Sequence, residues 1–187
     1  MESGNSYPVV WEAAPNAAKF ELRYSIDNGA TWLRAHTEPY ILGTTYNWPV
    51  PTLRKNKARC LMNVMEYNSK NVFVGSDRSD GVFNLEVLTI TSPVFNLVLS
   101  GAGSHTIIWE TNAINGTPSH TKLLYTLNGG TTWKSLGTAS GNPGNFTWNP
   151  LPAVLKAKTR CRIKLLLKDA LGATIASALS PFFTIQP

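Results

Sequence analysis

Cysteine and histidine are scarce: the 187 residues include two cysteines and three histidines. Cys60 in ARCLMNV and Cys161 in TRCRIKL lie 101 residues apart in similar surroundings, so a disulfide would have to bring equivalent positions of two units within about 7 Å. We therefore expect both to be buried as small apolar side chains. His36, His105 and His120 lack the spacing to cysteine or carboxylate that is typical of metal sites. No cofactor and no metal are predicted.

Long apolar runs are also missing. No stretch approaches the roughly 20 apolar residues of a membrane-spanning helix, so no membrane span is predicted, and the polar start MESGNSYP shows no signal-peptide pattern. Helical periodicity is not sustained anywhere. Instead Phe20, Leu22 and Tyr24 in KFELRYS alternate with polar residues, which is typical of a half-buried strand. Twelve prolines and fourteen glycines are scattered along the chain and favour many turns. The sequence predicts an all-β fold.

Carboxylates are few in the second half of the chain. Residues 1–85 carry nine Lys/Arg and eight Asp/Glu (+1), whereas residues 86–187 carry eight Lys/Arg and three Asp/Glu (+5). Those three, Glu86, Glu110 and Asp169, have no predicted reason to converge as an acid and base pair. Neither cysteine has a nucleophile signature, and no Gly-rich phosphate loop occurs. We predict that the chain is not an enzyme.

What the sequence does contain is a repeat of about 95 residues. Similar segments recur about 100 residues apart: YSIDNGATW (24–32) and YTLNGGTTW (125–133), Trp11 and Trp109, Trp48 and Trp148, KARC (57–60) and KTRC (158–161), SDGVFNL (79–85) and LSPFFTI (179–185). A unit of this length exceeds solenoid and propeller repeats and suits one β-sandwich of about 100 residues. We predict two tandem sandwich domains, at residues 1–86 and 87–187.

Several features together resemble the fibronectin type III/immunoglobulin-like modules of secreted bacterial proteins. They are the tryptophan on an early strand, the hairpin, Y-x-W-x-x-P, C-R and the final F-x-I. This resemblance covers nearly the whole chain. It implies immunoglobulin-like or fibronectin III-like sandwiches, an extracellular or cell-surface location, and other domains of a larger parent protein as partners.

The first copy departs from this pattern at its beginning. From ITSP onward, nineteen residues precede Trp109, but only ten residues precede Trp11. The first domain is therefore expected to lack most of its opening strand. Either the chain is trimmed there, or another chain or an upstream segment supplies that edge.

The first hairpin matches the Asp-box known from sialidases and other β-propellers, and the second resembles it. The matching residues are Ser25, Asp27, Gly29, Thr31 and Trp32 in the first copy, and Thr126, Asn128, Gly130, Thr132 and Trp133 in the second. A short Asp side chain can accept backbone N–H groups at a turn, and glycine tolerates positive φ. Asn128 replaces Asp27 in the second copy, which preserves a turn acceptor but not a catalytic carboxylate. We predict structural hairpins.

Basic residues occupy every second position of KAKTRCRIK: Lys156, Lys158, Arg160, Arg162 and Lys164. Because alternate residues of a strand share a face, we expect five cations along about 13 Å of one face. Lys122 stands where the first copy has Glu21, so this basic ladder of the second copy is expected to lack a carboxylate on the neighbouring strand. Such a face could bind acidic polysaccharide or a cell surface. Nucleic acid is not favoured, because interleaved aromatic residues are missing. The alternative is a solvated face that aids solubility.

Trp133 and Trp148 are candidates for stacking against sugar rings, although their recurrence in both copies favours packing. Three functions stay open on the sequence alone. The first is a non-catalytic spacer or surface-presentation module of a larger secreted or cell-surface protein. The second is a carbohydrate- or polyanion-binding module that uses the basic face of the second domain. The third is a subunit that assembles through the incomplete edge of domain one.

Overall fold

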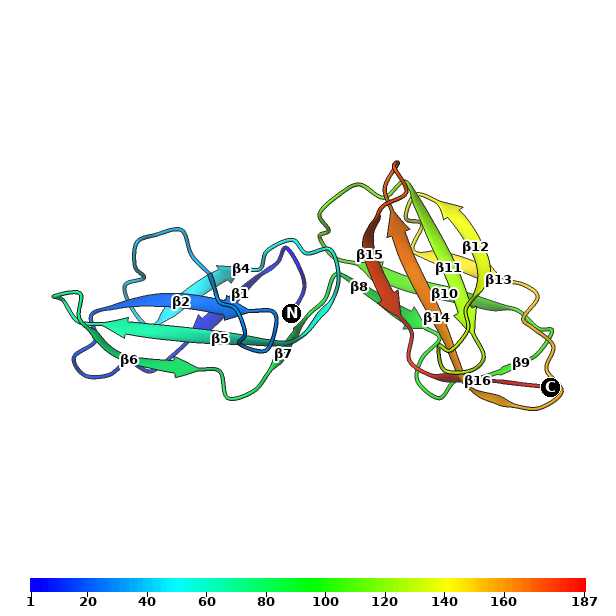
Figure 1. The fold of residues 1–187 in the computed structure, drawn as a ribbon, viewed down its shortest axis with the longest axis horizontal. Coiled ribbons are helices and arrows are strands. Elements are labelled where there is room, and N and C mark those ends of the chain that lie inside the picture. The colour runs from blue at the N-terminus through cyan, green and yellow to red at the C-terminus, as the bar shows by residue number, and fades with distance from the viewer. The chain divides into compact units, whose positions relative to one another are not determined.

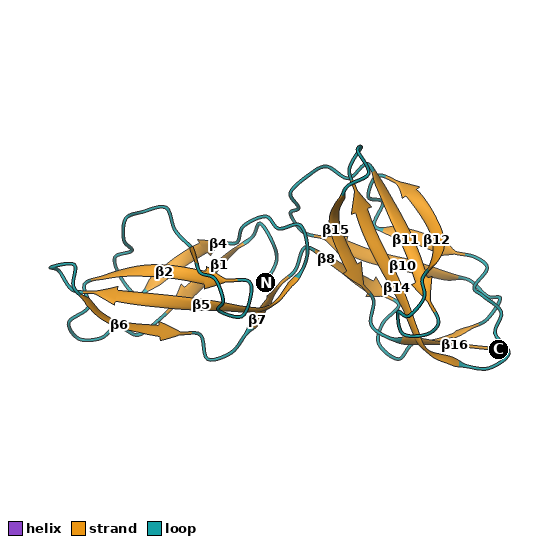
Figure 2. Cartoon of the chain, viewed as in Figure 1, coloured by secondary structure: helices purple, strands orange, loops and turns teal.

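The computed structural model describes residues 1–187 and contains sixteen strands and no helix (Figures 1 and 2). It therefore has no helix long and apolar enough to cross a membrane. The chain divides into two compact units: residues 1–51 with 57–86, and residues 52–56 with 87–187. These are called the first and the second unit below. The predicted all-β fold class, with tandem β-sandwich domains, is confirmed.

The first unit contains seven strands: β1 (Ser6–Val10), β2 (Lys19–Ser25), β3 (Leu33–Arg34), β4 (Thr45–Pro49), β5 (Lys57–Tyr67), β6 (Phe73–Arg78) and β7 (Phe83–Leu85). One sheet is the antiparallel pair β1-β4. The other has the order β3-β2-β5-β6, and β7 also pairs with β5. Aromatic rings fill the core between the sheets: the Trp11 and Phe20 centroids lie 5.3 Å apart, and those of Tyr24 and Trp48 lie 5.1 Å apart.

The second unit contains nine strands: β8 (Leu88–Ser92), β9 (Val98–Ser100), β10 (His105–Thr111), β11 (His120–Thr126), β12 (Lys134–Ser140), β13 (Asn145–Trp148), β14 (Lys158–Lys168), β15 (Thr174–Leu179) and β16 (Phe183–Gln186). One sheet has the order β13-β10-β8, and the other β12-β11-β14-β16-β9, with β15 also paired to β14. Side chains of both sheets form one buried cluster, which includes Ile107 and Trp109 from one sheet and Leu123 and Leu165 from the other.

The two units share the register of their central strands. Leu22 lies opposite Val64 on β2 and β5, and Leu123 lies opposite Leu165 on β11 and β14. Leu22 and Leu123 are both fully buried. The alternation seen in the sequence thus places equivalent apolar side chains in equivalent cores.

Residues 52–56 differ from the sequence-based division, which assigned them to the first domain. Leu53 forms an isolated bridge with Ile114, and Asn56 attaches the segment to β8. The Asn56 side-chain oxygen accepts the N–H groups of Val87 (2.7 Å) and Leu88 (3.0 Å), and its amide donates to the Leu88 carbonyl (2.8 Å). These hydrogen bonds satisfy the backbone at the start of β8, so the segment packs with the second unit.

The small sheets differ by one strand. In the second unit β10 has a neighbour on each side, β8 and β13. In the first unit β1 pairs with β4 alone.

Candidate functional site

The first hairpin uses its acidic residue to hold the turn. One carboxylate oxygen of Asp27 accepts the Thr31 N–H (2.9 Å) and the Ser25 hydroxyl (2.7 Å), and the other accepts the Thr31 hydroxyl (2.6 Å). The Gly29 N–H donates to the Ser25 hydroxyl oxygen (2.8 Å). The hydrogen bonds from Thr31, first from its side chain and then from its backbone, lower the pKa of Asp27 to about 2. The carboxylate is thus ionised and engaged inside the turn.

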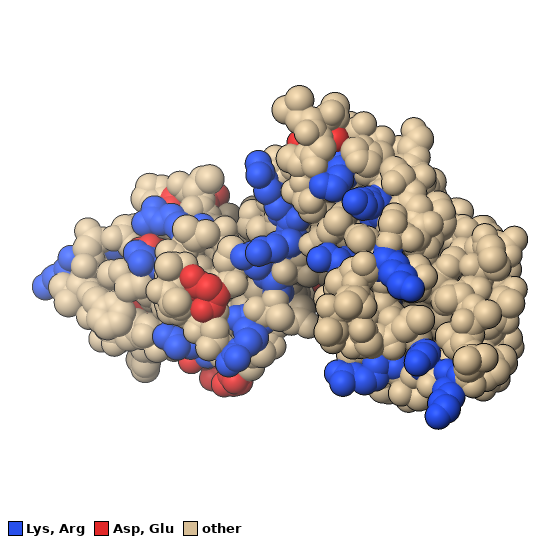
Figure 3. Space-filling view, turned by 45° about the vertical axis from the view of Figure 1, so that its right-hand side comes forward, with Lys and Arg blue, Asp and Glu red and all other residues tan.

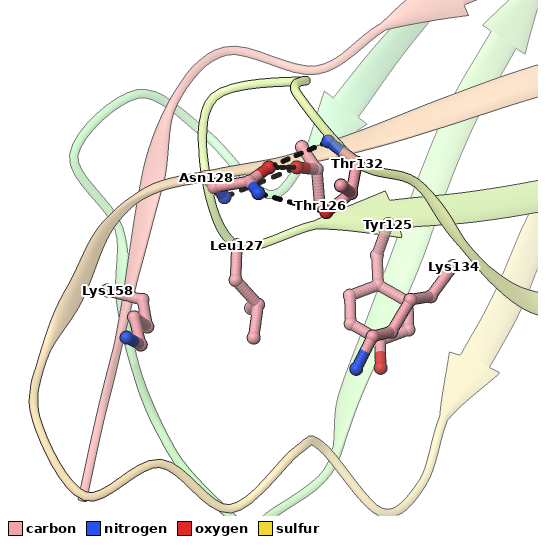
Figure 4. A pocket seen from close by; sticks show the side chains of 7 residues that line it. All are labelled: Tyr125, Thr126, Leu127, Asn128, Thr132, Lys134 and Lys158. Atoms are coloured by element: carbon pink, nitrogen blue, oxygen red, sulfur yellow. Dashed lines mark hydrogen bonds between the residues drawn. The ribbon is translucent and has the colours of Figure 1, made fainter.

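The second hairpin repeats this network with an amide (Figure 4). The Asn128 oxygen accepts the Thr132 N–H (3.0 Å) and the Thr126 hydroxyl (2.7 Å), and its amide donates to the Thr132 hydroxyl oxygen (2.9 Å). The Gly130 N–H donates to the Thr126 hydroxyl oxygen (3.1 Å). The geometry needs an acceptor at this position, and both Asp and Asn provide one.

A tryptophan covers each hairpin, and a cation covers the tryptophan. A Cβ atom on Gly29 would lie 3.5 Å from Trp32, and one on Gly130 would lie 3.5 Å from Trp133. The Arg78 guanidinium lies 5.0 Å from the Trp32 ring centroid, and the Lys164 ammonium 5.7 Å from that of Trp133. Both tryptophans are half-buried.

Trp148 was the other candidate for sugar stacking, and the structure instead places it in the core, as its recurrence in both copies favoured. It is 6% exposed and belongs to the core of the second unit. Its ring centroid lies 4.8 Å from that of Tyr125. Because the indole is buried between the sheets, it offers no face to a sugar.

A β-bulge divides the basic ladder, so the expectation of five cations on one face is wrong. Lys158 lies opposite Ile185 and Cys161 opposite Phe183, which places one extra residue on β14 between them. Directly opposed residues of an antiparallel pair point to the same side of the sheet. Lys158 therefore turns to the side of the buried Ile185, whereas Arg162 and Lys164 lie on the outer face.

The bulge is where the hairpin docks. The Gly129 N–H donates to the Arg160 carbonyl (2.8 Å), and in the first unit the Asn28 N–H donates to the Arg59 carbonyl (3.1 Å). The strand β5 has the same bulge, since Lys57 lies opposite Leu85 and Cys60 opposite Phe83. KARC and KTRC therefore recur together with the hairpins because each bulged strand presents a carbonyl that the hairpin binds.

Lys158 lines a pocket of about 240 Å³ next to the hairpin. Tyr125 and Leu127 point into it, with Lys158 on one side and Lys134 on the other (Figure 4). Sequence reasoning missed Lys134, which directly follows Trp133 and could have been found as the only cation of the β12 sequence KSLGTAS.

The two arginines in the middle of the ladder are engaged within the unit. The guanidinium carbons of Arg160 and Arg162 lie 5.6 Å and 4.7 Å from the Phe182 ring centroid. Arg162 also donates through Nε to the Ser180 carbonyl (2.8 Å). Both side chains thus stabilise the end of the sheet, while Lys156 lies exposed before β14 begins.

Lys164 lines a second pocket, of about 260 Å³, together with Lys55, Asn56 and Ser177. Lys55 belongs to residues 52–56 and was expected in the first domain. Two ammonium groups therefore border one hollow of the second unit. The chain sequence alone does not show that pairing, because 109 residues separate them.

Lys122 shares the outer face with Lys164, since Lys122 lies opposite Leu166 and Leu124 lies opposite Lys164. All three ion pairs of the structure, two of which involve Glu21, lie in the first unit. Figure 3 shows more Lys and Arg than Asp and Glu on the face that it presents. Lys122 and Lys164 thus form no ion pair with a carboxylate of the second unit.

Glu21 is paired with arginines of β2 and β3. It lies opposite Met65 and binds the side chains of Arg23 (2.7 Å) and Arg34 (3.4 Å). Burial alone would raise the pKa of Glu21, but the hydrogen bond from Arg23 and the charges of both arginines bring it below its ordinary value.

Cys60 and Cys161 are free and fully buried, as the sequence predicted. Each thiol donates to the backbone carbonyl three residues earlier, that of Lys57 (3.6 Å) or Lys158 (3.1 Å). Burial raises the pKa of both thiols. The structure has no group of three or more His, Cys, Asp or Glu side chains placed to hold a metal ion.

No protein-family model and no curated protein matches the sequence. Solved structures that are similar include the fibronectin(III)-like modules of Clostridium thermocellum CbhA, at 15% identity and a TM-score of 0.38 over 100% of this chain and 87% of that chain. The FN1-FN3 domains of chicken CNTN1 are 12% identical, with a TM-score of 0.36, over 98% and 62% of the two chains. A tetra-tandem repeat from the extending region of a large adhesion protein is 13% identical, with a TM-score of 0.30, over 95% and 49%. Since these TM-scores lie below 0.5, the fold assignment rests on the strand order of each unit.

Proposed function

We propose that the chain is a non-catalytic tandem β-sandwich module that acts as a spacer or surface-presentation unit of a larger secreted or cell-surface protein. One observation carries this proposal. The repeated residues most suggestive of chemistry are engaged in the same internal hydrogen bonds in both hairpins, whether the acceptor is Asp27 or Asn128. Repetition of a turn-holding network is what two copies of a structural module require, and the partners of such a module are the other domains of its parent protein.

Affinity electrophoresis tests the spacer role directly. The purified chain would be run through gels that contain neutral or acidic polysaccharides, and the same polymers would be assayed for release of reducing ends. A spacer leaves the mobility unchanged in every gel and releases no reducing ends. Cleavage of any polymer at a rate that Asp27→Asn abolishes would overturn the proposal.

A second candidate function is the binding of an acidic polysaccharide or an anionic cell surface by the second unit. It is favoured by the pocket that Lys55 and Lys164 share, with Lys122 on the same face as Lys164 and no carboxylate paired to any of them. Clustered cations of one sign raise the local concentration of a polyanion, and salt screens this attraction over about 10 Å at 0.1 M. The half-buried Trp133 beside Lys164 adds a partial ring face for a sugar.

Matched charge reversals test this second function. Lys164→Glu and Lys70→Glu change the net charge equally, but Lys70 lies in an exposed turn of the first unit. If the face binds, Lys164→Glu greatly reduces retardation by acidic polymers, and Lys70→Glu has little effect. The double variant Lys158→Glu with Arg162→Glu tests the remaining ladder, and Lys158→Glu alone tests the hairpin pocket. Equal effects of Lys164→Glu and Lys70→Glu would show attraction by net charge alone.

A further inference from the structure

The pocket beside the second hairpin, which we call the hairpin pocket, is lined by two lysines that lie on the core side of their sheet. Lys134 lies opposite Tyr125, which in turn lies opposite the fully buried Ile163. Lys158 lies opposite the fully buried Ile185. Directly opposed residues of an antiparallel pair point to the same side of the sheet. Both lysines are exposed and line the pocket, so they are not charges of the outer sheet face.

The first unit has a different residue at the position of Lys134. Leu33 lies opposite Tyr24 on β3 and β2, as Lys134 lies opposite Tyr125 on β12 and β11. Tyr24 is 9% exposed, whereas Tyr125 is half-buried. The second unit thus places a cation beside a more accessible phenol ring, where the first unit has an apolar side chain beside a covered ring.

The charge of the hairpin differs between the units in the same direction. Asn128 is neutral, and together with Lys134 and Lys158 it gives the hairpin pocket a net charge of +2. In the first unit the Asp27 carboxylate is ionised and offsets the single cation Lys57. Neither Lys134 nor Lys158 forms an ion pair. Two separate differences between the repeats therefore favour an anion in this pocket.

The size and the lining of the hairpin pocket suit a single ring. Its volume of about 240 Å³ lies below the roughly 300–1,000 Å³ of pockets that hold drug-sized ligands. Leu127 and the Tyr125 ring provide apolar surface, and Figure 4 shows no hydrogen bond from Tyr125 or the two lysines to the other residues drawn. Asn128 and Thr132, in contrast, bind each other within the turn. The ammonium groups and the phenol are thus the groups available to a ligand.

We propose that the hairpin pocket binds a single acidic sugar residue, whose carboxylate is held by Lys134 and Lys158. Ammonium groups form charge-assisted hydrogen bonds to a carboxylate. The Tyr125 hydroxyl binds a ring hydroxyl of the sugar, and the C–H face of the sugar packs on Leu127 and the Tyr125 ring. A small anion without a ring uses the two lysines alone and leaves this apolar surface uncovered, so an acidic sugar matches the lining better.

This binding goes beyond the spacer role and does not rest on the polyanion function, since none of Lys55, Lys122 and Lys164 lines the hairpin pocket. The probe is D-glucuronate, titrated into the full chain and followed by amide chemical shifts. D-Glucose has the ring without the charge, and acetate has the charge without the ring. Because a ligand of this size makes few contacts, we expect a Kd on the order of 1 mM for glucuronate. The largest shifts should occur around Lys134 and Lys158, and both control ligands should bind at least about tenfold more weakly.

Two variants give the hairpin pocket residues that the first unit already carries, so the fold tolerates them. Lys134→Leu removes one cation, and Asn128→Asp adds a carboxylate that the turn holds. Each should weaken glucuronate binding about tenfold or more. Lys70→Leu, an equal loss of charge in an exposed turn of the first unit, should have little effect.

Lys164→Glu separates this pocket from the polyanion function. It should greatly reduce retardation by acidic polymers, if the outer face binds them, and leave the affinity for glucuronate unchanged. No saturable binding of glucuronate, equal affinity for acetate, or binding that neither Lys134→Leu nor Asn128→Asp weakens would overturn the proposal.

Discussion

At the scale of single residues, Asp27 and Asn128 occupy equivalent positions of the two hairpins and accept the same hydrogen bonds, one as a carboxylate and the other as an amide. The Asp27 pKa of about 2 lies below its ordinary 3.8, so the network favours the ionised form. Its contribution to stability is complete above about pH 5 and is lost as the pH falls through 4 toward 2. We expect the urea midpoint of the first unit to fall more steeply between pH 5 and pH 2 in the wild type than in Asp27→Asn.

The reverse exchange supplies the control for this pH dependence. Asn128→Asp should give the second unit an added loss of stability over the same pH range, because its carboxylate would accept the same hydrogen bonds. Equal slopes for the wild type and Asp27→Asn would contradict the assignment of Asp27 as an ionised turn acceptor.

The two thiols allow a second prediction about single residues. Cys60 and Cys161 are fully buried, with raised pKa values, and thiolate exchange requires both access and ionisation. We expect neither thiol to react with an aromatic disulfide reagent within minutes in native buffer at pH 8, and both to react rapidly in denaturant. Cys60→Ala and Cys161→Ala assign the signals. A fast native reaction of one thiol would show that its core opens readily.

At the scale of elements, the sequence predicted the features that local chemistry determines. The period of two placed Leu22 in the core, and the hairpin residues identified both turns. The bulge in β14 was missed, because an extra strand residue leaves no mark in composition or alternation: Thr159 and Arg160 are unremarkable strand residues. The best signal was the joint repetition of KARC with the first hairpin and KTRC with the second. The recurrence of Trp148 favoured packing, but the sequence left sugar stacking open, since only tertiary packing decides which face of an indole is covered.

Packing between β12 and β13 gives a prediction at this scale. A Cβ atom on Gly137 would lie 2.5 Å from Cζ of Phe146, closer than two carbon atoms can approach. Gly137→Ala must therefore displace the ring from the edge of the core, and we expect it to lower the stability of the second unit by about 1–3 kcal/mol. Ser135→Ala, at an exposed position of the same strand, should change it by less than about 0.5 kcal/mol. Urea unfolding followed by tryptophan fluorescence measures the stability of both variants. Equal effects of the two substitutions would mean that the Phe146 ring moves aside without loss of stability.

At the scale of the whole molecule, the repeat predicted two β-sandwich units, because similar segments at a fixed spacing imply similar folds. The membership of residues 52–56 lay beyond the sequence, since it depends on Asn56 binding the backbone of Val87 and Leu88. For the same reason Lys55 was assigned to the first domain, and the pocket that it shares with Lys164 was not foreseen. Long-range backbone hydrogen bonds of this kind have no periodic signature.

Each unit has its own buried core, so we expect each to unfold as its own cooperative transition. Leu22 and Leu123 are equivalent and fully buried, and truncating either to alanine leaves a cavity that costs about 2–5 kcal/mol. Leu22→Ala should shift the denaturant midpoint at which the Cys60 thiol becomes reactive and leave that of Cys161 unchanged. Leu123→Ala should do the reverse, and each substitution thus serves as the control for the other. A joint shift of both thiols in either variant would show instead that the two sandwiches unfold as one cooperative structure.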